Sequence, residues 1–550
     1  MPDLVTELGH AALDLLGVHG YRAPPTPFEQ AVDIVAMREH GMVVAYHPIA
    51  RDIGLSVLAA GGNAFDALIA AIAAENVLAE GASTFAGSLG VLIYEAQDGR
   101  VSYLDAEFND PLSRDALWTP QRHANGRAVL VPGVPAGLEE LARRHGRMAL
   151  ADLLQPAIRL ADEGFAVGAL MALTIAERAA ILKRMDYGRR TFFRNGAPLR
   201  VGETLRQPEL AEFLRGLARE GSAYVYQGEF GERFVDAVAI EGGRLGAADL
   251  AAYQPRWCPP WHTTYRSRQV YASSGRSYGG LWALLALKTL EHASLPSDVH
   301  YSEDADTLKL LMRVAHEVWS EEFLYEDVMK APEETQRRLD NDYTRQLWQR
   351  MGATAKFTTH AGQGPHSFNL IALDRTGNIA SATVTAESDP WADGIFVDGL
   401  FLTNAGRIPW STAPGERRIS PLAIHLVLQD ARPRFVLGTI SNSVVEAAFQ
   451  ILVNLIDYGL PPHKAVAAPR FGTFPPKRNG GWSMPNLTRN WIDPRIDRRV
   501  VRASELRTRR RGLVDTGLGA VLALDDNGQH EGALVPIPYL PQPFSTGKPA

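Results

Sequence analysis

The stretch that decides the fold is GPHSFNLIALDRTGN, residues 364–378. It places a hydroxyl residue, Ser367, at the first position of an apolar run that ends in a tight turn from Asp374 to Asn378. Apolar residues bounded by turn-forming residues predict a short buried strand. If the peptide bond before Ser367 were broken, its new α-amino group would lie within reach of its own Oγ and could act as the activating base. The stretch therefore predicts a strand that begins with a candidate nucleophile.

The sequence around this stretch carries both strand and helix patterns. Before it, the apolar runs predict strands at 42–45, 88–95 and 101–105 and an Ala-rich buried helix at 66–74. Three- and four-residue apolar spacing predicts a mostly helical part between 132 and about 325, with helices at 137–144, 150–163, 208–220, 230–240, 279–290 and 304–323. The later elements are expected at 368–373, 379–384, 395–401, 423–428 and 434–437 as strands and at 444–458 as a helix. Strands at both ends of the chain with helices between them predict an α/β sandwich.

The composition excludes several classes of protein. Hydrophobic residues make up 46% and charged residues 21%, and the net charge is −6, so the chain is globular and lacks the basic character of a nucleic-acid-binding protein. Without a long apolar stretch or a basic leader, a cytoplasmic protein that does not contact a membrane is expected. The single cysteine, Cys258, cannot form an internal disulfide or a cysteine-based metal cluster. We expect no cofactor and no metal site.

Six further blocks resemble the γ-glutamyltranspeptidase family of N-terminal nucleophile hydrolases. The blocks are residues 41–45, 58–67, 131–138, 155–165, 243–253 and 465–471, and they occur in the family's order and spacing. The resemblance extends over nearly all of residues 41–475. It implies an αββα sandwich, in which two stacked antiparallel sheets lie between helical layers. It also implies an N-terminal arm at 1–40, a large-subunit-like region at 41–366 and a small-subunit-like region at 367–550, all in one interlocked fold.

The resemblance assigns the nucleophile. In this family a precursor cleaves itself before a Thr that starts a strand, and that residue then forms an acyl-enzyme resolved by water or an amine. Ser367 occupies the position of this Thr, and Thr385 falls where the family's second threonine hydrogen-bonds the nucleophile. The alternative nucleophile is Thr359, because residues 358–360 resemble the family's Thr-Thr-His string, although they lie further upstream of the strand.

The sequence departs from the family where the glutamyl group is bound. Members that hydrolyse glutathione-like substrates hold the α-carboxylate with an Arg, and Glu107 stands at that position. A carboxylate there would repel the substrate carboxylate instead of forming the bidentate pair that Arg provides. The family's Asp-Asp pair aligns with Arg407 and Ile408, and its paired serines align with Ser420 and Pro421. Both ends of glutamate recognition are therefore expected to be lost.

The oxyanion site is also altered, because the family's Gly-Gly aligns with Ser441 and Asn442. Backbone N–H donors survive this change, so both residues are expected to stabilise an oxyanion, with Asn404 lining the pocket. The leading hypothesis is an amidohydrolase or acyltransferase that forms an acyl-enzyme on Ser367 after autocleavage and acts on a small non-standard substrate. One alternative is an unprocessed, inactive homologue that serves as a binding or scaffold protein, and a second is an ordinary glutathione γ-glutamyltransferase or hydrolase. The expected partner is a small-molecule substrate, and a homodimer is one assembly that the sequence leaves open.

Overall fold

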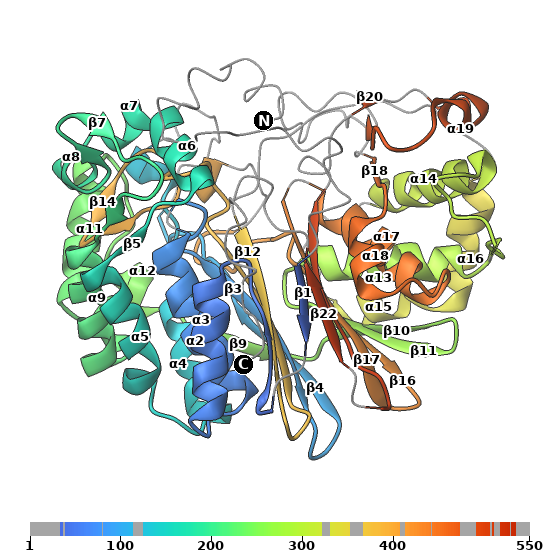
Figure 1. Cartoon of the computed structure of the whole chain (residues 1–550), viewed down its shortest axis with the longest axis horizontal. Helices are drawn as coiled ribbons and strands as arrows, with labels where there is room; N and C mark the ends of the chain where they lie inside the picture. Colours follow the sequence, from blue (N-terminus) through green and yellow to red (C-terminus); the bar gives the residue numbers. More distant parts are fainter. Residues whose placement is uncertain are drawn as a thin grey trace.

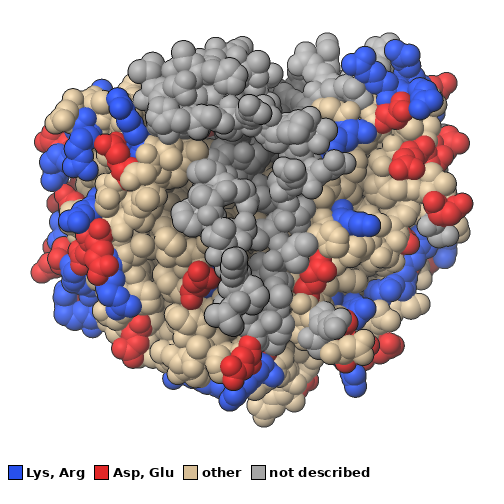
Figure 2. Space-filling model, in the orientation of Figure 1, with Lys and Arg blue, Asp and Glu red and all other residues tan. Residues whose placement is uncertain are grey.

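The structure of the chain is a computed structural model. It describes residues 33–36, 39–79, 81–113, 125–296, 298–321, 331–351, 367–407, 413–441, 443–473, 491–506, 509–510, 517–527 and 530–534. Within these ranges, none of the helices has both the length and the apolar character needed to span a bilayer. Acidic and basic side chains are interspersed over both sides of the face shown in Figure 2.

Two antiparallel sheets stack at the centre of the molecule (Figure 1). The six-stranded sheet has the order β2 (Gly41–Val44), β12 (Ser367–Asp374), β13 (Ile379–Thr385), β3 (Ser88–Glu95), β4 (Arg100–Ala106) and β9 (Arg256–Cys258). The seven-stranded sheet has the order β1 (Asp33–Ala36), β22 (Glu531–Leu534), β21 (Leu518–Ala523), β17 (Arg432–Ile440), β16 (Ala423–Gln429), β11 (Arg268–Ala272) and β10 (Trp261–Tyr265). Strands from before and after Ser367 share both sheets, so the two parts of the chain are interlocked. The expected region boundaries at residues 40 and 366 stay predictions.

Helices cover the outer face of each sheet (Figure 1). The helices on the side of the six-stranded sheet include α2 (Pro48–Ala59), α3 (Ala64–Leu78), α4 (Val134–His145), α5 (Leu150–Glu163), α9 (Pro208–Glu220) and α11 (Glu229–Ile240). Those on the other side include α13 (Tyr278–Leu290), α14 (Ala305–Trp319), α16 (Asn341–Arg350), α17 (Val444–Ile456) and α18 (Pro462–Ala467). The predicted αββα sandwich is confirmed.

Helix α3 shows why the local sequence folds as it does. Its Ala-rich sequence is apolar on every side, and all of its residues are buried between α2, α5 and the six-stranded sheet. A capping box starts it, because the Asn63 side chain accepts the Asp66 N–H and the Asp66 carboxylate accepts the Asn63 N–H. The helix thus becomes a rigid layer against β12 and β13.

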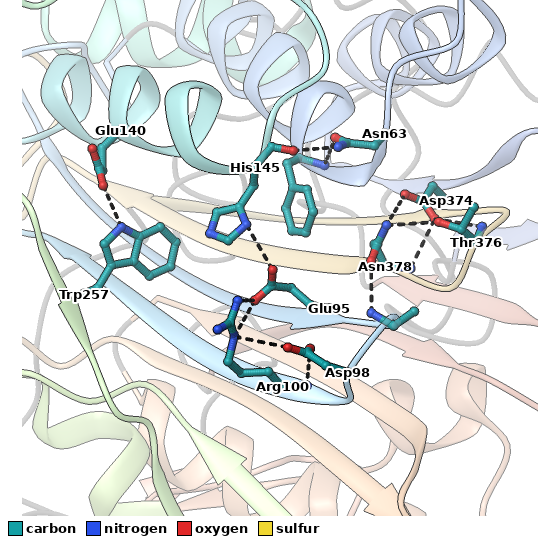
Figure 3. Close-up of polar contacts among 12 residues, drawn as sticks. Asn63, Glu95, Asp98, Arg100, Glu140, His145, Trp257, Asp374, Thr376 and Asn378 are labelled. Carbon is teal, nitrogen blue, oxygen red and sulfur yellow. Dashed lines mark hydrogen bonds and ion pairs between the residues drawn. The ribbon is translucent and has the colours of Figure 1, made fainter.

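The turn after β12 ties this layer to the sheet (Figure 3). The Asp374 carboxylate accepts hydrogen bonds from the backbone N–H groups of Ala64, Thr376 and Asn378 at 2.8–3.1 Å. The Asn378 side chain accepts the Ala96 N–H at 3.0 Å, which connects the turn to the β3–β4 hairpin. These contacts fix the register of β12, so its first residue, Ser367, is held at the opposite end of the sheet.

The observed elements differ from the sequence-based expectations in three places. The strand expected at 395–401 is a small hairpin of β14 (Phe396–Val397) and β15 (Leu400–Phe401), because Asp398 and Gly399 have φ of 46° and 82° and reverse the chain. The part expected to be mostly helical contains the β10–β11 hairpin. Strands β1, β21 and β22, which form one end of the seven-stranded sheet, were not predicted.

Candidate active site

Ser367 and Thr385 face each other at one end of the six-stranded sheet. Ser367 is the first residue of β12 and pairs in register with Thr385, the last residue of β13. The Ser367 Oγ donates a hydrogen bond to the Thr385 Oγ1 at 2.7 Å. Thr385 is buried and Ser367 is partly exposed. The Thr385 hydroxyl therefore contacts the Ser367 hydroxyl from the buried side of the site. The structure therefore brings these two predicted residues together, while their catalytic roles stay predictions.

Glu387 is a site residue that the sequence reasoning missed. Its backbone N–H donates to the Thr385 Oγ1 at 3.0 Å, and its φ of 46° turns the chain beyond β13 back toward the site. Burial raises the pKa of the Glu387 carboxyl to about 7, although Arg418 and the Ser420 hydroxyl act to lower it. The signal was its position, because Glu387 follows Thr385 by only two residues in the sequence.

Glu107 lies within the same polar cluster, directly after β4. Its side chain is only 1% exposed, and the Tyr103 hydroxyl donates to one carboxyl oxygen at 2.9 Å. Burial raises the pKa of the Glu107 carboxyl well above its usual range, and the charges of Asp105 and Glu387 add to this effect. The Ser420 hydroxyl and the Tyr103 hydroxyl act in the opposite direction by hydrogen bonding.

Ser420 connects the two glutamates. It is 1% exposed, and its hydroxyl lowers the pKa of both the Glu107 and the Glu387 carboxyl. The same hydroxyl accepts the Leu422 N–H at 3.2 Å. The Ser420 carbonyl accepts the backbone N–H of Tyr278 at 2.9 Å, so helix α13 holds this segment in place. The predicted substrate-binding residues Glu107 and Ser420 are therefore neighbours in the structure.

Two buried arginines lie behind the cluster. The Arg417 Nε is 2.9 Å from an Asp105 carboxylate oxygen, and both side chains are at most 2% exposed. The Arg418 Nη1 is 2.9 Å from an Asp110 carboxylate oxygen, and both of these side chains are 3% exposed. Each guanidinium is thus paired with an aspartate, and Arg418 acts on Glu387 only through its charge.

Asn404 and Arg407 are held by one acidic residue, Asp393. The Asn404 Nδ2 donates to an Asp393 carboxylate oxygen at 3.2 Å, and the Arg407 Nη2 lies 2.9 Å from the same oxygen. The Ala405 carbonyl between them accepts a hydrogen bond from the Arg418 Nη2, which places this segment beside the polar cluster. The Arg407 side chain is 41% exposed. The Arg407 guanidinium therefore pairs with Asp393, a residue that the sequence reasoning did not identify.

Ser441 stands at the end of β17 with φ of 86°. This left-handed conformation favours glycine, since an L-residue loses roughly 1–2 kcal/mol there. The backbone at this point therefore has the geometry of a glycine although the residue is a serine. Four predicted or aligned positions lie outside the described residues: Asn442, Ile408, Thr359 and residue 366.

Replacing Ser441 with glycine should stabilise the protein. We expect the free energy of unfolding to rise by about 1 kcal/mol, because the left-handed φ no longer opposes a side chain. Urea unfolding followed by tryptophan fluorescence measures this change. Ser443→Gly is the matched control, because Ser443 has φ of −120° and its replacement should give no stabilisation. An unchanged or lower stability of Ser441→Gly would show that the serine conformation is not strained.

The described residues do not offer an obvious metal centre or a reactive thiol. In the ranges that the structure describes, no group of three His, Cys, Asp or Glu side chains is placed to hold a metal ion. Cys258 is buried on β9, and burial raises the pKa of its thiol to about 12. It therefore stays protonated near neutral pH.

Comparison with known proteins gives consistent matches over most of the chain. The family model described as gamma-glutamyltranspeptidase matches residues 50–503. A glutathione hydrolase proenzyme from Bacillus subtilis is 27% identical over 499 residues, which cover 82% of this chain and 84% of the relative. An acylase ACY 1 proenzyme from a Pseudomonas species is 29% identical over 490 residues, which cover 82% of this chain and 86% of the relative.

Solved structures extend the likeness to the fold. The crystal structure of a cephalosporin acylase from Bacillus halodurans superposes with a TM-score of 0.76 at 23% identity. The match covers 94% of this chain and 98% of that one. A Helicobacter pylori gamma-glutamyltranspeptidase structure matches with a TM-score of 0.54 at 25% identity, over 58% of this chain and 94% of that one.

Proposed function

We infer that this chain, which belongs to the gamma-glutamyltranspeptidase family, cleaves itself before Ser367 and then uses Ser367 to hydrolyse or transfer a small acyl group. The observation that carries this proposal is the Ser367–Thr385 hydrogen bond at the start of β12. A residue at the beginning of a strand needs only one broken peptide bond to become an N-terminal nucleophile, and the strand keeps its hydroxyl in place. The word proenzyme in the names of its relatives is consistent with such processing.

The reaction follows from the groups around Ser367. The free α-amino group takes the proton of the Ser367 Oγ as this oxygen attacks the acyl carbon. The backbone N–H groups of Ser441 and Asn442 stabilise the oxyanion, and the amine leaves with the proton returned from the α-ammonium. Water or a second amine then attacks the ester and restores Ser367. Thr385 orients the nucleophile through the 2.7 Å hydrogen bond.

The substrate is proposed to be other than an ordinary γ-glutamyl compound. A γ-glutamyl group would bring its α-carboxylate toward a cluster that already holds the carboxyls of Glu107 and Glu387. Both carboxyls are buried, so repulsion is screened less than at an exposed surface. The similar identities to a glutathione hydrolase and to an acylase are compatible with a different acyl group.

Incubating the purified protein and assaying an anilide tests the proposal. We expect the chain to separate into bands of roughly 40 and 20 kDa, with Ser367 as the first residue of the smaller one. The value of kcat/KM for γ-glutamyl p-nitroanilide should be about 100-fold below that of the Bacillus subtilis relative, because the α-carboxylate loses a charged partner. A chain that stays as one band and hydrolyses no anilide would favour an unprocessed binding protein. Turnover equal to that of the relative would instead favour an ordinary glutathione hydrolase.

A further inference from the structure

We propose that the polar cluster beside Ser367 forms a substrate pocket for an acyl group with a cationic head, an ammonium or a guanidinium, which binds between the carboxylates of Glu107 and Glu387. This inference rests on the proposed function, since it names the substrate class of the same site. It reverses the charge that the pocket must recognise relative to a γ-glutamyl substrate.

The first support is that both carboxyls have an unused oxygen. The Oε2 atoms of Glu107 and Glu387 are each buried and have no hydrogen-bond partner within the described part of the chain. Buried polar atoms in native proteins are nearly always paired, so an unpaired one calls for a missing partner. Two such oxygens in one cluster, with Ser420 acting on both carboxyls, form a receptor for a group that donates several hydrogen bonds.

The second support is that the neighbouring cations are already engaged. Arg417 is bound by Asp105 and donates to the Asn109 side chain at 2.8 Å and the Gln254 carbonyl at 2.7 Å. Arg418 is bound by Asp110 and donates to the Ala405 carbonyl. These guanidinium groups are held by their own aspartates, and within the described residues neither is hydrogen-bonded to the Oε2 of Glu107 or Glu387, although the charge of Arg418 acts on Glu387. A substrate cation can supply the remaining counter-charge.

The other ionisable groups around the pocket reinforce its acidic character. Asp105 and Tyr103 face Glu107 from β4, and both act on its pKa. Tyr278 at the start of α13 lies near both Glu387 and Glu446. The Trp319 Nε1 donates to Glu446 at 2.9 Å, so this third glutamate has a partner of its own. Within the described residues, the buried carboxyl oxygens that lack a hydrogen-bond partner are therefore those of Glu107 and Glu387.

The backbone of Glu387 is also next to the reacting atom. The Glu387 N–H and the Ser367 Oγ bind the same Thr385 Oγ1, at 3.0 Å and 2.7 Å. An acyl carbon attacked by Ser367 would therefore lie a short chain away from the two carboxylates. Small ω-aminoacyl groups, with an ammonium at the end of a short methylene chain, match this arrangement.

A panel of p-nitroanilides of equal length tests the inference on the processed protein. We expect kcat/KM for 5-aminopentanoyl anilide to exceed that for the neutral pentanoyl anilide by about 100-fold, because a charge-assisted hydrogen bond replaces two unpaired oxygens. The anionic glutaryl anilide should be the poorest of the three. Equal or better turnover of the pentanoyl or glutaryl anilide would overturn the inference.

The pH dependence adds a second readout. Burial raises the pKa of both carboxyls, and that of Glu387 to about 7, so Glu387 loses its charge as the pH falls through about 7 and the preference for the cation must fall with it. The ratio of the two kcat/KM values, cationic over neutral, should therefore rise from about pH 6 to about pH 8. Taking the ratio cancels the titration of the α-amino base. A ratio that does not change with pH would contradict ionisation of these carboxyls on binding.

Matched variants locate the effect. Glu107→Gln and Glu387→Gln should each lower the cationic-over-neutral ratio by about 10-fold or more. Glu95→Gln is the control, because Glu95 lies at the other end of β3, roughly 23 Å from Ser88, and pairs with His145 and Arg100 (Figure 3). A ratio that stays unchanged in both site variants would contradict the proposed binding mode.

Binding without turnover separates this inference from the proposed function. Calorimetry on the full chain should detect tighter binding of 5-aminopentanamide than of pentanamide, and Glu107→Gln should reduce the difference. If the amine binds but no anilide is hydrolysed and no cleavage occurs at Ser367, the proposed function fails and the pocket assignment stands. If anilides are hydrolysed without preference for the amine, only the pocket assignment fails.

Discussion

Ser367→Ala should leave the chain as one uncut polypeptide and reduce anilide turnover by at least about 10⁴-fold, because the variant removes the attacking oxygen. The change removes one partly exposed hydroxyl and its hydrogen bond to Thr385 at the start of a strand, so the fold should persist. Denaturing gels after prolonged incubation and kcat/KM for the best anilide give the two measurements. The circular dichroism spectrum should match that of the unmodified protein.

Two companion variants sharpen this test. Ser367→Thr keeps a hydroxyl in the same register opposite Thr385 and should retain cleavage and measurable turnover. Thr359→Ala removes the alternative nucleophile and should change neither property. Cleavage that persists in Ser367→Ala but stops in Thr359→Ala would identify Thr359 as the nucleophile.

Arg417→Ala should cause a large loss of stability, because it removes a buried cation beside the site. We expect the free energy of unfolding to fall by about 3–5 kcal/mol, because the Asp105 carboxylate would remain buried without its counter-charge. The guanidinium also lies over the Tyr253 ring at 4.8 Å and donates to the Gln254 carbonyl, so several contacts disappear together. Urea unfolding measured by fluorescence reports the loss.

Arg499→Ala is the matched control for this prediction. Arg499 also pairs with an aspartate, Asp497, at 3.0 Å, but its side chain is 90% exposed. Exposed ion pairs contribute roughly 0–1 kcal/mol to stability, so the free energy of unfolding of this variant should be nearly that of the original protein. A similar small effect for Arg417→Ala would show that Asp105 finds another partner or becomes protonated without disturbing the fold.

Much of the fold could be predicted because local patterns were strong. The Ala-rich α3, the β3–β4 hairpin and the start of β12 at Ser367 were all expected from apolar runs bounded by turn residues. The β10–β11 hairpin was missed because the sequence around it was interpreted as helical. The strand expected at 395–401 was wrong because the left-handed turn at Asp398 and Gly399 was not recognised.

The candidate site was predictable only in part. Alignment to a family motif could place Ser367 and Thr385 eighteen residues apart, and antiparallel pairing of two adjacent strands then brings them opposite each other. Nothing local connects Asp393 to Asn404 and Arg407, because these contacts depend on how the β14–β15 hairpin folds back. Glu387 was overlooked although it follows Thr385 closely.

The sequence by itself determined the family, the layered fold and the strand that begins at Ser367, because these depend on apolar periodicity and on motifs that are short-range along the chain. Only the tertiary structure decided how the buried charges are matched. It paired Arg417 with Asp105 and Arg418 with Asp110, and among the residues that the structure describes it left the Oε2 atoms of Glu107 and Glu387 without a hydrogen-bond partner. These residues come from segments that are distant in the sequence, and charge compensation depends on distance and burial in space.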